Sequence, residues 1–88
     1  MLNSEFISQR SKGLATLLLK DTTISDSERI ERAFLAAFAR KPMAGEIDKA
    51  LNYIAALQEK IGSPEAKAYA WQSYCQILMA SNEFAYIE

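Results

Sequence analysis

The 88-residue sequence contains no histidine and only one cysteine. Without histidine, the chain lacks the commonest general base, the commonest transition-metal ligand and the side chain that titrates near neutral pH. The single cysteine, Cys75, excludes an internal disulfide and a cysteine-rich metal site. The composition therefore argues against histidine-based catalysis and zinc centres, and we expect no metal and no cofactor.

The chain also lacks a long hydrophobic run and an excess of charge of either sign. No apolar segment approaches the roughly 20 residues that span a bilayer, and the start does not have the charged and apolar regions of a signal peptide. The 10 basic and 11 acidic residues are well mixed and give a net charge of −1. Nucleic acids and anionic membranes attract concentrated positive charge. We therefore expect no nucleic acid and no membrane as a partner, and the compartment stays unknown.

What the chain does have is apolar residues at helical spacing. Hydrophobic residues, with alanine counted among them, make up half of the sequence, a normal fraction for a single globular domain. Strand-like alternation is absent, so the sequence predicts an all-α fold over residues 1–88. We expect helices at about 4–20, 26–39, 44–61 and 64 to 80 or 81. The short connections between them favour a compact four-helix arrangement. The residues expected to face the core are Phe6, Ile7, Leu14, Leu17, Leu18, Ile30, Ala33, Phe34, Ala37, Phe38, Ile47, Leu51, Ile54, Leu57, Ile61, Trp71, Tyr74, Ile77 and Leu78.

Capping residues predict where these helices begin and end. Ser25 followed by Glu28 matches a capping box, in which each side chain satisfies the backbone donor of the other. Gly62 suits the position after a helix, because glycine enters the left-handed region without a Cβ clash. Ser63 and Pro64 then predict the restart of the chain as a fourth helix.

The closing segment reads "SNEFAYIE" and raises the question of how the last helix stops. Asn82 tolerates the left-handed conformation that ends helices. We therefore expect the helix to end there, with Phe84 and Tyr86 folding back onto the bundle as a packed C-terminal tail. The similar "NSEF" near the start is interpreted as an unrelated helix-capping device.

Three further patterns favour structural over functional interpretations. A calcium loop starting at Asp21 fails because Asp26 stands where glycine is needed and Arg32 where a bidentate glutamate is needed. Cys75 lies in a helix with no activating histidine, so it is interpreted as a small buried apolar residue. The aromatic residues of the last helix are interpreted as core rather than as a ligand groove, and they are Tyr69, Trp71 and Tyr74.

A basic cluster on the second helix is the remaining candidate site. Arg29, Arg32 and Arg40 project from broadly one side of that helix, as an anion-binding surface would. Glu28 and Glu31 interrupt the cluster, so we interpret it as a solvated face of mixed charge.

Two stretches, residues 29–54 and 70–88, carry the pattern of a known family. They resemble the C-terminal end of the DUF1553 (PSD1) family of large proteins from planctomycetes and related bacteria, and "LNSEFI" at 2–7 resembles the opening of the same region. The chain departs from the family where Ala39 replaces a usual glycine and Met43 a helix-capping threonine. The residues that match the family's closing motif are Ala70, Trp71, Cys75, Leu78, Ser81, Asn82, Glu83, Phe84, Tyr86 and Ile87.

The resemblance implies a role within a longer protein. The biochemical role of the family is not established; its members are often exported, often pair with a DUF1549 region and often carry a CxxCH haem motif. That motif does not occur here, so no haem is implied. We expect a non-catalytic helical module for structure or interaction, whose partner is the remainder of a parent protein or another protein. Residues such as Leu19, Leu35 or Ile24 would then be exposed and favour a homo-oligomer.

Two other function classes stay open from the sequence. In the first class, the module would contribute Arg40, Glu83 or Tyr86 to an active site completed by other domains. In the second class, it would be a helix-turn-helix nucleic-acid binder. We further expect Arg40 and Glu83 to form an ion pair that holds the tail. The candidate structural or interaction residues are Arg40, Trp71, Asn82, Glu83, Phe84 and Tyr86.

Overall fold

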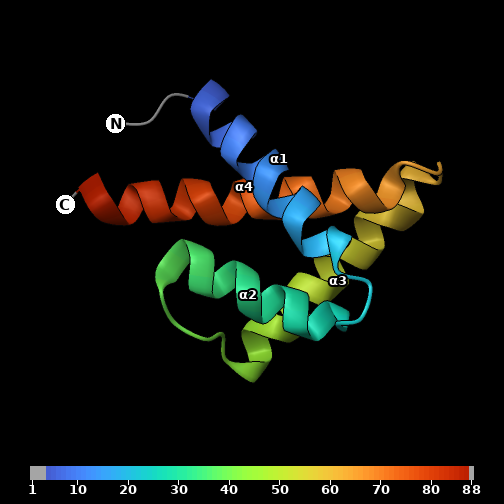
Figure 1. Ribbon diagram of the computed structural model, residues 1–88, viewed down its shortest axis with the longest axis horizontal. Coiled ribbons are helices and arrows are strands. Elements are labelled where there is room, and N and C mark those ends of the chain that lie inside the picture. The colour runs from blue at the N-terminus through green and yellow to red at the C-terminus, as the bar shows by residue number, and fades with distance from the viewer. Residues whose placement is uncertain (1–3, 88) are drawn as a thin grey trace.

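The computed structural model describes the backbone of residues 4–87 and the side chains of residues 5–81. It contains four helices, as Figure 1 shows: α1 (Ser4–Lys20), α2 (Asp26–Phe38), α3 (Ala44–Ile61) and α4 (Ala66–Ile87). No strand occurs among the described residues. The predicted all-α, four-helix arrangement with short loops is therefore confirmed.

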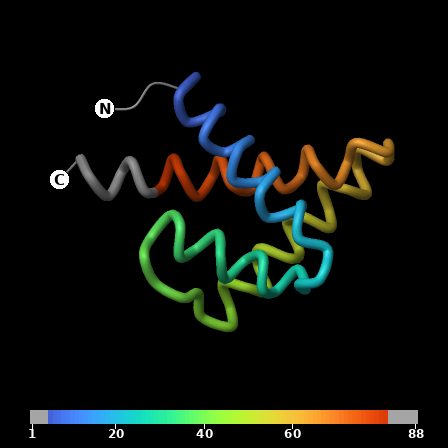
Figure 2. The backbone as a smooth tube through the Cα atoms, viewed as in Figure 1, coloured from blue at the N-terminus to red at the C-terminus, as the bar shows by residue number. Residues whose placement is uncertain are grey.

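The last helix, α4, is the centre of the arrangement. It contacts each of the other three helices and packs most extensively on α1, which crosses it (Figure 1). The path of the backbone in Figure 2 shows that α2 and α3 lie together on the other side of α4 from the start of α1. Within the described residues α1 and α3 do not contact each other. The core therefore forms around one face of α4 and extends from it in two directions.

The core consists of apolar side chains from all four helices. Trp71 and Cys75 of α4 have no exposed surface, and neither does Ile30 of α2. The Trp71 ring packs edge-on against Tyr74, with centroids 6.3 Å apart, an arrangement that the quadrupoles of aromatic rings favour. The predicted burial of Trp71 is confirmed, and this residue anchors the interior.

Local capping chemistry explains the helix bounds that agree with the sequence. α1 and α3 have the predicted bounds. The Ser25 hydroxyl accepts from the Glu28 backbone N–H at 3.2 Å and begins α2, as N-cap residues do. Gly62 has φ 64° and donates its N–H to the Gln58 carbonyl, which ends α3.

The ends of α2 and α4 differ from the predictions. α2 ends at Phe38, one residue early, because Ala39 itself adopts the left-handed conformation. α4 begins at Ala66 rather than at Pro64, after a tight turn in which the Ala66 N–H donates to the Ser63 carbonyl.

α4 also continues to Ile87, so the prediction that it ends at Ala80 or Ser81 is wrong. Asparagine permits the left-handed conformation without requiring it, and no glycine or proline follows Asn82 to interrupt the helix. The predicted packing of Phe84 and Tyr86 concerns side chains outside the described residues. The side chains of Asn82 and Glu83 also lie outside them.

Three residues predicted to face the core lie at the surface instead. Leu17 is 66% exposed, Phe6 is 39% exposed, and Ile77 is 46% exposed. α1 buries the line Ile7, Ser11, Ala15 and Leu18, whose spacings of three and four residues fit one helical face. Phe6 and Leu17 each stand one residue off that line, so the helix turns them toward its flanks. The apolar pattern of the sequence did not predict this buried face of α1, because Ser11 is polar.

Candidate functional site

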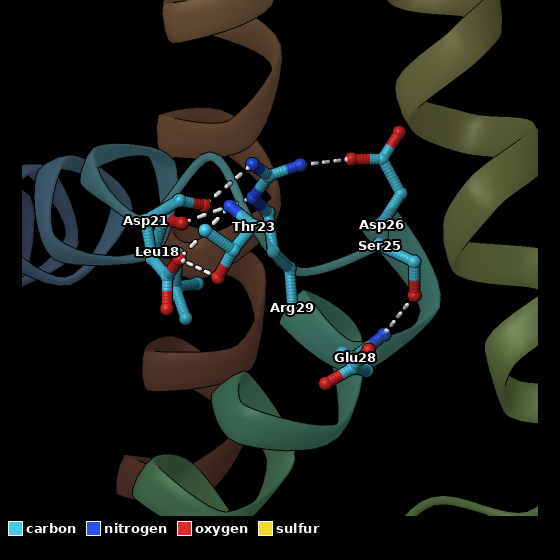
Figure 3. A network of polar contacts seen from close by, with 7 residues as sticks. All are labelled: Leu18, Asp21, Thr23, Ser25, Asp26, Glu28 and Arg29. Carbon is cyan, nitrogen blue, oxygen red and sulfur yellow. Dashed lines mark hydrogen bonds and ion pairs between the residues drawn. The ribbon is translucent and has the colours of Figure 1, made fainter.

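Arg29 holds the turn between α1 and α2 from inside the protein (Figure 3). Its side chain is buried, and its Nε donates to the Leu18 carbonyl at 2.9 Å. Nη2 donates to the Asp21 carbonyl at 2.9 Å, and Nη1 donates to the Asp26 carboxylate at 2.6 Å. Carbonyls at the end of a helix lack partners within the helix. Arg29 therefore closes the end of α1, and its guanidinium is not free to bind a ligand.

Asp21 organises the same turn from its outer side. Its Oδ1 accepts from the Thr23 backbone N–H at 2.9 Å and from the Thr23 hydroxyl. Its Oδ2 lies 3.5 Å from Arg32 Nη1. The hydrogen bonds from Thr23, assisted by the positive charge of Arg32, lower the pKa of the Asp21 carboxyl. The Asp21 carboxylate therefore stabilises the α1–α2 turn through these contacts.

Arg40 holds the second turn, between α2 and α3, from the surface. Its two terminal nitrogens each donate to one oxygen of Glu46, both at 2.9 Å. The guanidinium carbon also lies 5.2 Å from the centre of the Phe34 ring and 5.8 Å from that of Phe38. A planar cation stacks favourably on aromatic faces. Arg40 thereby joins the end of α2 to the start of α3.

Glu46 also caps the start of α3, where the side chain of the N-cap residue Met43 does not. Met43 is the N-cap residue of α3, and its side chain forms no capping hydrogen bond. Instead, the Met43 backbone N–H donates to Glu46 Oε1 at 2.9 Å. The hydrogen bonds from Arg40 and then from Met43 lower the pKa of the Glu46 carboxyl to about 2. This pair was not predicted from the sequence, although a glutamate at the third position of a predicted helix is a signal for such capping.

The three arginines thus each have partners within their own turns. The expected solvated face of mixed charge is correct for Arg32 and Arg40, which are exposed, and wrong for Arg29, which is buried. The burial of Arg29 depends on the end of α1 meeting the start of α2, a contact that the sequence alone does not reveal. The predicted ion pair of Arg40 with Glu83 involves a side chain outside the described residues.

The side chains with reactive or polar atoms on α4 belong mainly to the core. Burial raises the pKa of the Cys75 thiol to about 12, so this sulfur stays protonated at neutral pH. Trp71 and Tyr74 are buried, as predicted, whereas Tyr69 lies at the surface. The Trp71 indole N–H has no hydrogen-bond partner among the described residues. Among those residues, no group of three or more cysteines, aspartates or glutamates is placed to hold a metal ion.

Among the described residues, several grooves open on the surface beside α4, and two of them bear on function. The first, which we call the α2–α4 groove, has a volume of about 280 Å³ and is lined by residues of α2, α4 and, between them in sequence, α3. Tyr53 and Ile77, which line it, are partly exposed, and the Tyr53 hydroxyl shares a 2.7 Å hydrogen bond with Ser73. The residues that line it include Phe34, Glu46, Lys49, Tyr53, Tyr74 and Ile77.

The second groove, which we call the α1–α4 groove, lies where α1 packs on α4 and has a volume of about 380 Å³. Ala15, Leu19 and Ala68 provide apolar atoms in it. The lysines of α1 that line it are Lys12 and Lys20. Of the three residues expected to be exposed, Leu35 is exposed, whereas Leu19 and Ile24 are partly buried.

Comparison of the chain with protein-family models, with curated proteins and with solved structures gave no match. None of the helices in the described part of the chain has the length and apolar character needed to cross a membrane. The candidate residues Arg40 and Trp71 are therefore placed by the structure alone, one at the α2–α3 turn and one in the core.

Proposed function

We propose that this chain is a non-catalytic helical module that packs against other domains of a larger protein or against a partner protein. The observation that carries the proposal is the α2–α4 groove, whose apolar side chains remain partly exposed at Tyr53 and Ile77. Contiguous exposed apolar surface is typical of protein interaction sites. Leu35 is also exposed and adds apolar area on α2.

The state of the polar side chains supports a structural role over a catalytic one. The Cys75 thiol is buried and protonated at neutral pH. Arg29 is committed to backbone carbonyls and Arg40 to Glu46. An active site that used Arg40 would first have to break its two hydrogen bonds to Glu46. Perturbed groups in clefts mark candidate catalytic sites. Glu46 does line the α2–α4 groove, but its carboxylate is already bonded to Arg40 and to the Met43 backbone N–H.

We further propose that the chain corresponds to the C-terminal region of a DUF1553-type protein. The support is the closing pattern that includes Trp71, Cys75 and Tyr86, together with the left-handed conformation of Ala39, where that family usually has glycine. Reading the coding sequence upstream of this chain tests the assignment. A preceding DUF1549 region or a CxxCH segment is the expected result, and an in-frame stop codon shortly upstream of the Met1 codon, with neither segment nearby, would contradict it.

Sedimentation velocity of the isolated chain over a range of concentrations tests the docking role. The expected result is reversible self-association, because the isolated chain leaves the α2–α4 groove open. Ile77→Glu places a charge at the groove and should give a monomer with unchanged helix content by circular dichroism. Gln76→Glu, which adds the same charge at the neighbouring exposed position of α4, should leave the association unchanged.

Two results together would contradict the docking role. They are a wild-type chain that stays monomeric at every concentration and a Tyr53→Ser variant with the same free energy of unfolding as the wild type. Equal loss of association in Gln76→Glu and Ile77→Glu would show that net charge, rather than the apolar surface, controls assembly.

A further inference from the structure

The α1–α4 groove combines apolar surface with two lysines that have no charged partner among the described residues. Lys12 and Lys20 line it from α1, and Gln72 lines it from α4. Neither ammonium forms an ion pair or a hydrogen bond within the part of the chain that the structure describes. The described residues that line the groove include no carboxylate. The chain has more acidic than basic residues overall, so this local excess of positive charge is a property of the groove and not of the composition.

The form of the groove favours a helix as its occupant. Both walls are helices, whose backbone groups already bond within α1 and α4, so the groove offers no edge to which a strand might add. A helix satisfies its own backbone groups and needs only side-chain contacts. Ala15 and Ala68 are small, which allows the backbone of an incoming helix to come close. Leu19 is partly buried and offers an apolar contact for leucine or alanine side chains.

The charge of the groove determines which edge of that helix is acidic. Lys12 and Lys20 are eight residues apart, which corresponds to about 12 Å along α1 at 1.5 Å per residue. Two carboxylates separated by two helical turns on the incoming helix match this distance. Duplex nucleic acid needs a broader positive surface than two lysines in a chain of net charge −1, and an anionic membrane needs a basic cluster of several residues.

We propose that the α1–α4 groove binds an acidic amphipathic helix of the parent or partner protein, with carboxylates two turns apart facing Lys12 and Lys20. The inference rests on the docking role proposed above and adds the chemistry of the partner. It assigns a second docking surface, separate from the α2–α4 groove, because no residue lines both grooves among those described.

Fluorescence anisotropy with the full chain tests the proposal. The probe is a labelled synthetic peptide of about 18 residues, long enough to hold a helix, with leucine and alanine on one face and two glutamates two turns apart on its edge. Saturable binding that weakens as salt is raised is the expected result. In nitrogen-15 spectra, the backbone signals that move should be those around Ala15 and Ala68.

Charge-reversed variants assign the binding to the groove. Lys12→Glu with Lys20→Glu should weaken binding of the acidic peptide by about tenfold, and the same peptide with lysines in place of its glutamates should bind this variant better than the wild type. Lys41→Glu with Lys60→Glu is the matched control. It makes the same change in net charge, and Lys60, like Lys20, lies in the last turn of its helix. This control should bind nearly as the wild type does.

Equal weakening by both double variants would overturn the proposal, as would signals that move around Tyr53 and Ile77 instead. Absence of binding by the acidic peptide, or tighter binding of vesicles rich in phosphatidylserine or of duplex DNA, would also overturn it. None of these results affects the test of the α2–α4 groove by sedimentation, so failure of this inference is distinguishable from failure of the docking role.

Discussion

The two turns that flank α2 use the same residue type in opposite surroundings. In the α1–α2 turn, Arg29 is buried and donates to two backbone carbonyls as well as to Asp26. In the α2–α3 turn, Arg40 is half exposed, forms a forked pair with Glu46 and covers two aromatic rings. A buried guanidinium has lost its water and depends fully on its protein partners, whereas an exposed one exchanges them for water at little cost. The first turn is therefore part of the core, and the second is a surface latch.

The largest effect is expected where the buried arginine is removed. Arg29→Met leaves the carbonyls of Leu18 and Asp21 without their donor and should lower the free energy of unfolding by about 2–3 kcal/mol. Urea unfolding followed by circular dichroism measures this. Arg29→Lys should recover only part of the loss, because an ammonium lacks the planar fork.

Arg32→Met is the control for that experiment. It removes an exposed arginine from the same helix, whose ion pair with Asp21 is 3.5 Å long, and it should have a much smaller effect. Equal destabilisation by Arg29→Met and Arg32→Met would show that the burial of Arg29 does not set its contribution to the stability of the α1–α2 turn.

The next effect concerns the backbone of the second turn. Ala39 has φ 56°, a left-handed conformation that is unfavourable for residues with a Cβ atom. Ala39→Gly should raise the free energy of unfolding by about 1 kcal/mol. Ala36→Gly, at an exposed helical position three residues earlier, should lower it by a similar amount. Thermal unfolding of both variants measures the two shifts, and shifts of the same sign would contradict the assigned conformation.

A smaller effect is expected for the surface latch itself. Double-mutant cycles that combine Arg40→Glu with Glu46→Arg or with Glu83→Arg distinguish the observed partner from the one that the sequence predicted. We expect the reversed pair at 40 and 46 to recover part of the stability that each single change removes. Stronger coupling of residue 40 with 83 than with 46 would instead support a latch between the second turn and the C-terminal segment.

The smallest effect is a dependence on acid pH. The folded pKa of Glu46 is about 2, below its ordinary value of 4.5. The stabilisation from its charge is therefore fully present above pH 4.5 and is lost as the pH falls through about 2. Glu46→Gln keeps an oxygen to accept from the Met43 N–H but removes the charge, so the stability difference between wild type and variant should shrink over this interval. Urea midpoints at several pH values measure it, and a constant difference would refute the lowered pKa.

The sequence predicted the parts of the fold that depend on local chemistry. Ser25 and Gly62 mark helix ends through their own hydrogen bond and backbone conformation, as expected. The reciprocal hydrogen bond from the Ser25 N–H to Glu28, the other half of the predicted capping box, is not present among the described residues. Trp71 is buried because a large aromatic side chain at helical spacing has much apolar surface to remove from water. The same local reasoning failed at Asn82, where the tendency to end a helix was permitted but not used.

The candidate sites were harder to predict because they depend on contacts between elements. The burial of Arg29 requires α1 to end beside the start of α2, and the exposure of Leu17 requires Ser11 to face the core. The α1–α4 groove joins Lys12 to Ala68, which are far apart in sequence. No periodicity in one helix reveals such pairs. The Arg40–Glu46 pair is the exception, since both residues lie within one turn and its flanking helix ends.

The burial of Trp71 and Cys75 has a practical consequence. Each is the sole residue of its type in the chain, and they lie on successive turns of α4 with no exposed surface. A thiol-modifying reagent reaches the sulfur only when the interior transiently opens, while indole emission reports the polarity of the same place. In the wild-type chain, the rate of thiol modification and the indole emission therefore both report transient opening of the core, without any introduced label.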